Sequence, residues 1–482
     1  MADIYRPSLR LRPSEQRSIL LLGDFIASAA AMFLAMYAWR EYNYYALLSK
    51  GYTENQIVRL QLGIQVPAWF YILPIIWLLL LVESYEVHTA ASWRKTLRSI
   101  AVAPIIGLLA YSVLFIINQE PTGALPRVGI GLFLVFTSIL TLVWRGIYIR
   151  LYTSSGLMRR IVIVGAGRAG RSLAEVYSKM SPPPFILLGF IDDDLAKQGK
   201  SISGFAVLGS SEKLLDFIED YRISDIIIAI NGEIKGETFQ TILDVQERGV
   251  EVTRMPILYE EMTGRVPIDH LESDWVIRSF VDQVRTRGTY ELSKRIMDIF
   301  GGLLGLFIFW AVYPFVGLAI VLESGFPILY SQPRLGKGGS EFKIYKFRSM
   351  KQNAEADGKA KLATENDPRI TKVGNFMRRT RLDELPQFWS VVRGEMSLVG
   401  PRAERAELVR SFQKQIPFYR ARLLVKPGLT GWAQINYGYV ADVKDTAVKL
   451  EYDLYYIKHR SLNMDFTIVL RTIGTVLRRT GR

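Results

Sequence analysis

Cysteine is absent from the 482 residues, and histidine occurs only three times. The lack of cysteine excludes a disulfide framework, a thiolate metal site, an iron–sulfur cluster and a cysteine nucleophile. The three histidines, His88, His270 and His459, are far apart in the sequence, which disfavours a histidine-based zinc site and a Ser–His relay. The chemistry of this protein must therefore be sought in other residue types.

Negative charge is scarce in the last third of the chain. From Glu323 to the end there are 29 Lys and Arg against 16 Asp and Glu, so this part carries +13 of the net charge of +14. A basic segment attracts the phosphates of nucleic acids, nucleotides or lipid headgroups. The chain as a whole is 49% hydrophobic and 22% charged, which excludes a wholly disordered protein, and its length predicts roughly three folded units.

Charges are also nearly missing from four early stretches, 18–39, 60–82, 99–119 and 128–144. Each is about long enough to cross ~30 Å of hydrocarbon as a helix. Lys and Arg at the N-terminal end, in the loop before residue 99 and after residue 144 place the N-terminus and everything after residue 150 on the cytoplasmic side. Asp24 is the one charge inside the first stretch. We expect it at headgroup level or facing the bundle, with a functional role as the alternative.

A fifth uncharged stretch, Ile299–Leu322, has features of a helix that enters the membrane and returns. Pro314 lies in its middle and removes a backbone hydrogen bond, which kinks a helix. Both flanks are basic, so both favour the cytoplasmic side. A bent, re-entrant helix over about 294–322 satisfies both facts, and an ordinary fifth crossing is the alternative.

Between residues 161 and 280 strand-like and helix-like segments alternate, as in a doubly wound nucleotide-binding domain. A first strand leads into Gly165, Gly167 and Gly170, which would form a tight turn at the start of a helix. Asp192 follows a second strand, close to where a ribose-binding carboxylate belongs. The alternative is a scaffold that packs or dimerises, and no residues for hydride chemistry are evident.

The basic C-terminal region contains two adjacent acids, Asp383 and Glu384, in a run of arginines. The simplest interpretation is a solvated ion-pair surface. However, neighbouring positions on a helix point about 100° apart, so the two carboxylates cannot do the same job. One could face a reacting phosphorus while the other holds a metal or a proton, with nearby arginines and lysines on phosphate oxygens. A metal ion such as Mg²⁺ would screen the carboxylates from a diphosphate, and a carboxylate can attack phosphorus.

Four motifs then identify a family: KFRSM ending at Met350, LDELPQ at 382–387, GEMSLVGPR at 394–402 and KPGLTGWAQ at 426–434. With them, the chain closely resembles the polyprenyl-phosphate hexose-1-phosphate transferases, which are large monotopic phosphoglycosyl transferases. The resemblance implies a membrane protein of α plus α/β class. Its parts would be four transmembrane helices over 1–150, a Rossmann-like cytoplasmic domain over 151–280, and a mainly helical catalytic domain over 281–482 with the re-entrant helix.

The resemblance also implies roles for individual residues. Asp383 would be the nucleophile and Glu384 its acidic partner, and both would hold Mg²⁺, with Mn²⁺ as an alternative. Pro314 would kink the re-entrant helix, and Asp453 matches a motif acid for which a structural ion pair is an equal alternative. The residues expected to bind phosphate or nucleotide are Lys346, Arg348, Arg378, Arg402, Thr430 and Gly431. Many relatives carry Asn-Gly-Arg after WAQ, where this chain has Asn436-Tyr437-Gly438-Tyr439, and this departure bears on an arginine-mediated contact there and on the choice of sugar.

The implied reaction is transfer of hexose 1-phosphate from a UDP-hexose, with glucose or galactose expected, to undecaprenyl phosphate, with release of UMP. It would be the first membrane step of exopolysaccharide, capsule or O-antigen synthesis and would take place at the bacterial inner membrane. The protein is expected to form a homodimer and to bind no nucleic acid. An amphipathic pattern from Phe466 to Leu477 predicts a helix in the membrane interface, or else an ordinary packing helix. The alternative function is a membrane-tethered nucleotide-binding regulatory protein without catalysis. A nucleic-acid binder would not explain the paired acids beside a hydrophobic hairpin.

Overall fold

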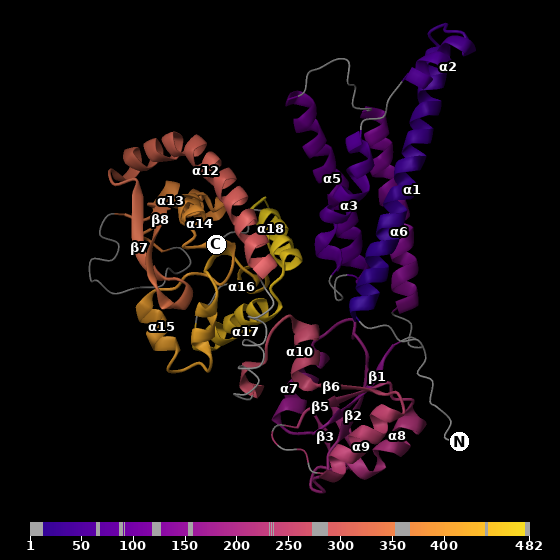
Figure 1. Cartoon of the computed structure of the whole chain (residues 1–482), viewed down its shortest axis with the longest axis vertical. Helices are drawn as coiled ribbons and strands as arrows, with labels where there is room; N and C mark the ends of the chain where they lie inside the picture. Colours follow the sequence, from indigo (N-terminus) through magenta and orange to yellow (C-terminus); the bar gives the residue numbers. More distant parts are fainter. Residues whose placement is uncertain are drawn as a thin grey trace. The chain divides into compact units, whose positions relative to one another are not determined.

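The computed structural model describes residues 13–477 except 64–67, 86–89, 91, 118–126, 153–157, 231, 233, 235, 272–287, 352–366 and 439–441. The chain forms two compact units, Met1–Met255 and Pro256–Arg482. The first combines a helical bundle with an α/β domain, and the second is mainly helical (Figure 1).

The bundle of the first unit is built on two long helices, α1 (Pro13–Leu48) and α6 (Arg127–Tyr152). They pack along each other, with α5 (Trp93–Ile117) and the short α3 (Leu73–Leu80) beside them (Figure 1). Glu15–Leu48 and Val128–Leu151 are long and apolar enough to cross a membrane.

Of the second predicted crossing, 60–82, the structure describes two parts, and residues 64–67 between them lie outside the described residues. The described part of α2 is Glu54–Gly63, and the apolar helical segment Ala68–Leu80 begins as the 3₁₀ turn η1 (Ala68–Ile72). Such a segment spans roughly 20 Å at 1.5 Å per residue, less than a bilayer core. A further 3₁₀ turn, η2 (Val82–Tyr85), follows α3. Four crossings before residue 150 therefore stay a prediction.

Asp24 faces the bundle interior, one of the two positions expected for it. Its Oδ2 accepts a hydrogen bond of 2.6 Å from Nη2 of Arg145, and both side chains are 0% exposed. A second nitrogen of Arg145, Nη1, donates to the carbonyl of Ser84 at 3.0 Å. A buried charge is tolerated when it is paired and hydrogen-bonded, so the pair accounts for the one acid inside the apolar stretch 18–39.

The α/β domain has a six-stranded sheet in the order β3-β4-β2-β1-β5-β6, with all neighbours parallel except β3 and β4. The strands are β1 (Arg160–Val164), β2 (Ile186–Ile191), β3 (Ser201–Ile202), β4 (Phe205–Gly209), β5 (Asp225–Ile228) and β6 (Glu251–Arg254). The helices are α7 (Arg168–Ser178), α8 (Leu214–Tyr221) and α9 (Gly236–Glu247), with the short η3 (Ser211–Lys213) before α8. This is the doubly wound arrangement that the alternation predicted.

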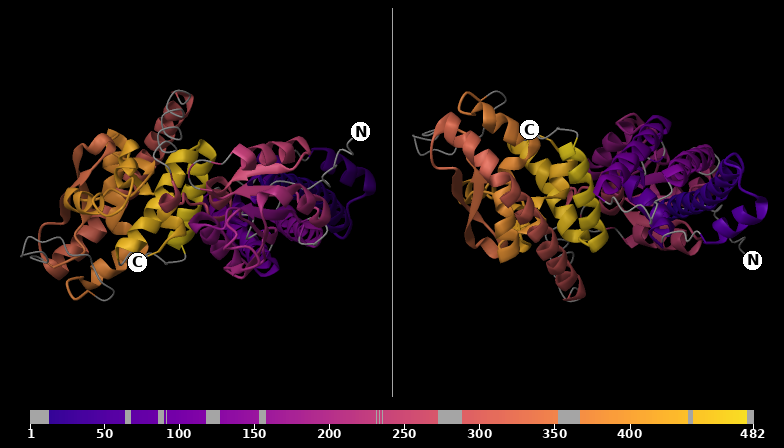
Figure 2. Two further views of the ribbon diagram at one scale, coloured as in Figure 1. Left: turned by 90° about the horizontal axis from the view of Figure 1, so that it is seen from below. Right: turned by 90° about the horizontal axis from the view of Figure 1, so that it is seen from above.

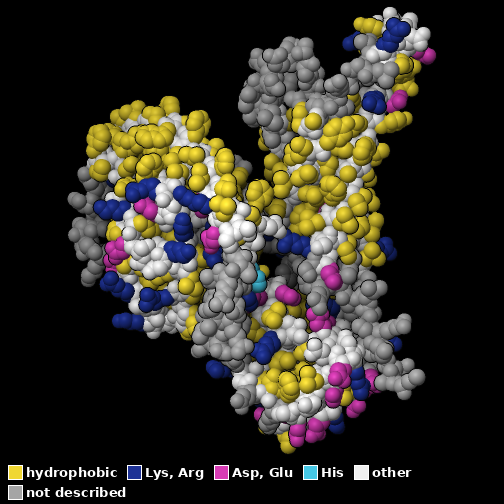
Figure 3. Space-filling view, in the orientation of Figure 1, with side chains coloured by type: hydrophobic (Ala, Val, Ile, Leu, Met, Phe, Trp, Pro, Cys, Tyr) yellow, Lys and Arg dark blue, Asp and Glu magenta, His cyan; other side chains and the backbone are white. Residues whose placement is uncertain are grey.

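The second unit begins with a long helix, α12 (Gly288–Ser324), which bends along its length (Figure 1) and contains Pro314. One side packs closely through glycine: a Cβ on Gly301 would lie 2.5 Å from Leu398, and one on Gly305 would lie 2.3 Å from Phe388. Its other side chains include a large exposed apolar set, among them Phe300, Leu304, Phe307, Trp310, Phe315 and Leu322. The helix is long and apolar enough to cross a membrane, and its exposed surface forms the apolar cap of this unit in Figure 3.

The rest of the second unit supports the site. An antiparallel hairpin pairs β7 (Leu329–Leu335) with β8 (Glu341–Phe347) through the turn η6 (Lys337–Gly339), and β9 (Ser397–Val399) pairs in parallel with β10 (Gly428–Thr430). The helical elements are α13 (Lys372–Thr380), η7 (Leu382–Gln387), α14 (Phe388–Arg393), α15 (Ala406–Phe412), η8 (Tyr419–Leu424), α16 (Trp432–Asn436), α17 (Val443–His459) and α18 (Leu462–Leu477).

The helix α18 lies alongside α12 (Figures 1 and 2). It buries Asp465 and Ile468 in the unit and leaves Phe466 and Ile473 exposed. One face of α18 therefore packs as an ordinary helix, and the interfacial role expected for its exposed apolar residues stays a prediction.

Residues directly after Met255 pack with the second unit, whereas the sequence placed the domain boundary near 280. They form α10 (Met255–Thr263) and η4 (Ile268–His270). The Nζ of Lys458 in α17 donates to Glu260 in α10 at 2.8 Å, and Trp432 Nε1 donates to the carbonyl of Gly264 at 2.8 Å. These tertiary bonds, which have no local sequence signal, decide which unit holds 256–271.

Candidate active site

The two adjacent acids lie in η7, a tight helical turn between α13 and α14. Thr371 caps α13 by accepting a hydrogen bond from the backbone N–H of Gly374 at 2.9 Å. Arg381 ends α13 in the left-handed region with φ of 58°, a conformation that is uncommon for residues other than glycine. This reversal starts η7 directly at the acids.

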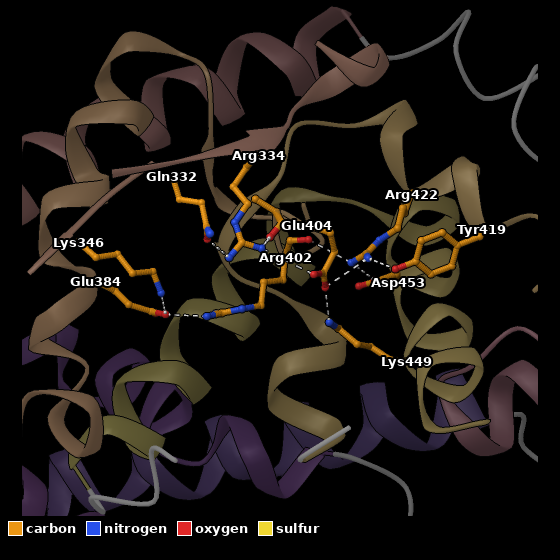
Figure 4. A network of polar contacts seen from close by, with 11 residues as sticks. Gln332, Arg334, Lys346, Glu384, Arg402, Glu404, Tyr419, Arg422, Lys449 and Asp453 are labelled. Carbon is orange, nitrogen blue, oxygen red and sulfur yellow. Dashed lines mark hydrogen bonds and ion pairs between the residues drawn. The ribbon is translucent and has the colours of Figure 1, made fainter. Parts of the chain in front are cut away.

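Glu384 is the centre of a cluster of cations (Figure 4). Its Oε1 accepts hydrogen bonds from Lys346 Nζ at 3.1 Å and from Arg402 Nη2 at 2.9 Å, and its Oε2 lies 3.6 Å from Arg381 Nη1. Burial alone would raise the pKa of Glu384, but the three cations hold it well below its usual range. Glu384 is therefore ionised and holds the basic groups together.

Asp383 is buried, with 6% of its surface exposed. Burial and the neighbouring Glu384 raise its pKa to about 6, against the opposing effect of Lys346, Arg402 and Arg378. The pKa values of the two adjacent acids are thus shifted in opposite directions. Asp383 is suited to exchange a proton or to act as a nucleophile, whereas Glu384 stays charged.

The structure brings Lys346 and Arg402 to the acids, as the sequence predicted, and places Arg378 within electrostatic reach of Asp383. Nη1 of Arg378 is buried and has no hydrogen-bond partner among the described residues. A buried guanidinium nitrogen without a partner is costly, and an anionic substrate group would relieve this cost. Arg378 is therefore well suited to bind phosphate.

Arg348 and Thr430 are occupied by the protein itself. Arg348 Nη2 donates to the carbonyl and the Oγ of Ser324, both at 2.9 Å, and to the carbonyl of Gly325, so it holds the end of α12. Its Nε and Nη1 are buried without partners among the described residues. The Thr430 hydroxyl lies 2.6 Å from that of Thr472 in α18. Phosphate binding by Arg348 and Thr430 stays a prediction.

Three motif glycines, Gly400, Gly428 and Gly431, allow two chain segments to approach closely. A Cβ on Gly431 would lie 2.2 Å from the carbonyl oxygen of Gly400, and one on Gly428 would lie 2.1 Å from the nitrogen of Gly400. No side chain fits at such distances, so GEMSLVGPR and KPGLTGWAQ pack backbone to backbone around β9 and β10. This contact positions Arg402, which pairs with Gly428.

A second polar network, which the sequence analysis did not identify, continues from Arg402 (Figure 4). Glu404 lies 2.9 Å from Lys449 Nζ and 3.5 Å from Arg422 Nη1. Nη2 of Arg422 donates to Asp453 at 2.9 Å and to the carbonyl of Arg402 at 3.1 Å. Asp453 is thus a buried structural ion-pair partner, one of its two expected roles. Glu404 lies between β9 and α15, two residues after the motif GEMSLVGPR, whereas its partners come from η8 and α17. No local sequence signal therefore indicated this network.

The departure from the family pattern after WAQ lies partly outside the described residues, since Tyr439 is not among them. Asn436 Nδ2 donates to the carbonyl of Trp432 at 3.0 Å, and the Tyr437 hydroxyl donates to Asp445 at 2.8 Å. Both side chains stabilise the local fold around α16 and α17.

For a metal, the described residues offer no group of three or more Asp, Glu or His side chains. Mg²⁺ is commonly held by one or two carboxylates together with substrate phosphates and water. Asp383 and Glu384 would take that limited role, although Glu384 already pairs with Lys346 and Arg402, and metal binding by these two acids stays a prediction.

The α/β domain contains a separate cleft of about 490 Å³ at the carboxyl ends of its strands. Gly165, Gly167 and Asp192 line it, whereas Gly170 lies against the turn, where a Cβ would be 2.2 Å from the carbonyl oxygen of Gly165. Asp192 accepts a hydrogen bond from Ala166 N–H at 2.7 Å. The sequence thus located a cleft, and its nucleotide ligand stays a prediction.

Two family models match the chain. The model described as "Bacterial sugar transferase" matches residues 289–479, which contain α12 and the Glu384 cluster. The model described as "CoA-binding domain" matches residues 81–256, which include the α/β domain.

Curated relatives match as well. A UDP-N-acetylgalactosamine-undecaprenyl-phosphate N-acetylgalactosaminephosphotransferase from Aeromonas hydrophila is 43% identical over 47% of this chain and 52% of its own length. A UDP-glucose:undecaprenyl-phosphate glucose-1-phosphate transferase from Escherichia coli is 33% identical over 65% of this chain and 67% of its own length. An undecaprenyl-phosphate glucose phosphotransferase from Komagataeibacter xylinus is 32% identical over 76% and 69%. The chain therefore spans about half to two thirds of the length of these relatives.

Proposed function

This chain belongs to the bacterial sugar transferase family, a family of phosphotransferases, and we propose that it transfers a sugar 1-phosphate from a UDP-sugar to undecaprenyl phosphate, releasing UMP. The observation that carries the proposal is the pair of the buried Asp383 and the half-buried Glu384. Lys346, Arg402 and Arg378 surround this pair in the part of the chain that matches the family model.

The reaction would proceed in two displacements at phosphorus. The carboxylate of Asp383 attacks the β-phosphorus of the UDP-sugar, the bond to the bridging oxygen breaks, and UMP leaves with that oxygen. The phosphate of undecaprenyl phosphate then attacks the acyl phosphate and regenerates the carboxylate. No net proton or oxidant is required.

The cations would stabilise the charge that develops in both steps. Glu384 holds Lys346 and Arg402 in place, so these groups need not reorganise when the diphosphate arrives. Arg378, with its unpartnered Nη1, would bind a phosphoryl oxygen directly. Mg²⁺, with Mn²⁺ as an alternative, would be held by Asp383 and Glu384 and would supply neutralisation of the diphosphate charge.

The direct test mixes purified full-length protein with undecaprenyl phosphate, Mg²⁺ and one UDP-sugar at a time, and measures UMP. Relatives named for glucose, galactose and N-acetylgalactosamine make these the UDP-sugars to compare first, with glucose or galactose expected. We expect release that depends on the lipid for turnover and stops when the metal is chelated. A protein that binds nucleotide without releasing UMP from any of them would instead support the regulatory alternative.

The membrane arrangement is part of the same proposal, because one substrate is soluble and the other is held in the bilayer. We propose that α12 enters the cytoplasmic leaflet of the bacterial inner membrane, bends at Pro314 and returns. Its exposed apolar residues and the basic residues at both of its ends support this arrangement. The proposal also includes that the protein forms a homodimer and that it does not bind nucleic acid.

Because the chain contains no cysteine, the topology of α12 can be tested by labelling single introduced cysteines, with no native cysteine to react. Single cysteines replacing Leu292 and Phe326, near the two ends of α12 and both exposed, are expected to react with a membrane-impermeant maleimide only after the cytoplasmic side is opened. A cysteine replacing the exposed Leu195 in the α/β domain serves as the cytoplasmic reference. Labelling of one end from the outside would show an ordinary crossing.

A further inference from the structure

A small cavity lies beside the N-terminal part of α12, and none of its lining residues belongs to the Glu384 cluster. Its polar lining is mostly basic and includes Lys294, Arg295 and Asp298 of α12, Lys337 of the β7–β8 turn, Lys426 and Arg460. The volume of about 40 Å³ has room for a few water molecules or one phosphate-sized group, and no room for a nucleoside or an isoprenoid chain.

The carboxylates near this cavity are already committed. Lys294 pairs with Asp465 at 3.0 Å, and Arg460 pairs with Glu291 at 3.2 Å. Oδ1 of Asp298 accepts hydrogen bonds of 2.9 Å from the Ser397 hydroxyl and from the backbone N–H of Leu398. Asp465 and Glu291 therefore neutralise Lys294 and Arg460, and Asp298 accepts hydrogen bonds from the segment that contains β9.

Three cations at the cavity are left without a carboxylate. Arg295 donates to the carbonyls of Val391 and Val392 at 2.9 and 2.7 Å. In the described part of the chain, neither Arg295 nor Lys337 nor Lys426 forms an ion pair within 4.0 Å. Burial, followed by the charge of Arg295, lowers the pKa of Lys426, and Lys337 adds to this effect, whereas Asp298 and Glu291 act against it. Like charges held this close repel each other, and a bound anion would stabilise them.

The cavity lies where α12 changes from polar to apolar. The uncharged stretch of this helix begins at Ile299, directly after Asp298, and Leu292, Ile296 and Phe300 nearby are exposed. On the face drawn in Figure 3, Lys and Arg side chains gather below the apolar cap of this unit. Cations at the edge of a membrane-facing apolar surface are placed at the level of lipid phosphates.

We propose that this cavity binds the phosphate of an anionic phospholipid headgroup, with Lys337 and Lys426 as its principal contacts and Arg295 behind them. Binding there would anchor the base of α12 at the membrane surface and would set its depth. The site is independent of the transfer reaction, since it shares no residue with the cluster around Asp383.

The test titrates detergent-solubilised full-length protein with dioctanoyl phosphatidylglycerol, dioctanoyl phosphatidylcholine or inorganic phosphate, and follows the shift in thermal unfolding. We expect saturable stabilisation by phosphatidylglycerol, with affinity reduced about tenfold or more in the K337Q/K426Q double variant. The K337R/K426R variant should retain binding because it keeps both charges. The K414Q/K444Q variant removes the same charge from two exposed lysines and should bind as the wild type does.

Three results would overturn the proposal. Equal loss in K337Q/K426Q and K414Q/K444Q would show a response to overall charge. Equal binding of phosphatidylcholine would show attraction of the acyl chains alone. Saturable binding of inorganic phosphate with no added affinity for phosphatidylglycerol would show a site for a soluble anion. Loss of UMP release with lipid binding intact would count against the proposed function only.

Discussion

Replacement of Asp383 by asparagine is expected to lower UMP release by at least about a thousandfold, as removal of a covalent nucleophile does in other enzymes. The substitution keeps the size of the side chain and replaces the nucleophilic carboxylate by a neutral amide, whose oxygen is a poor nucleophile. Because Asp383 is buried and carries a raised pKa, a neutral amide at this position should be tolerated by the fold. Thermal unfolding should therefore change little, while the sugar-phosphate adduct disappears from mass spectra of the protein incubated with UDP-sugar.

The matched control is Asp244→Asn, the same chemical change at an exposed position of α9, which should leave UMP release unchanged. Nearly normal release by the Asp383→Asn protein would contradict covalent catalysis by this residue. Normal nucleotide binding by a wild-type protein that never releases UMP would favour a regulatory protein.

Replacement of Glu384 by glutamine should have the second-largest effect, and its pH dependence should identify the cause. Without the carboxylate, Lys346 and Arg402 lose their common partner, and we expect UMP release to fall about a hundredfold. The charge of Glu384 also contributes to the raised pKa of Asp383, which is about 6. Removing that charge must lower the pKa of Asp383, because the negative charge of Glu384 no longer opposes its ionisation while the nearby cations still favour it.

In the wild type, kcat/KM should fall as the pH decreases through about 6, because the nucleophile must be ionised. In the Glu384→Gln protein this acidic limb should move to lower pH, a change that general loss of structure does not produce. Glu407→Gln, on an exposed position of α15, should leave the limb in place. An unshifted or raised limb in the Glu384→Gln protein would contradict the electrostatic coupling of the two acids.

Several elements of the fold could be predicted because their signals are local. The alternation of strands and helices from residue 161 and the glycine-rich turn predicted the doubly wound sheet, since periodicity and turn residues act over a few positions. The uncharged stretch after Lys294 and Arg295 predicted a long apolar helix, and the structure has α12 there. The second crossing, over 60–82, stays a prediction, because the described helical segments Ala68–Ile72 and Leu73–Leu80 cover only part of it.

For the site, the sequence by itself determined the chemistry: adjacent acids among arginines in family motifs, which include Lys346 and Arg402 as well as Asp383 and Glu384. Only the tertiary structure decided which of these side chains contact each other and which role each one has. It showed Glu384 holding the cations, Arg348 bound to the end of α12, and Asp453 joined to Arg422. The physical reason is that burial and ion pairing depend on groups far apart in the chain. The residue type limits the chemistry that a side chain can perform, and its contacts in the folded protein determine which role it has.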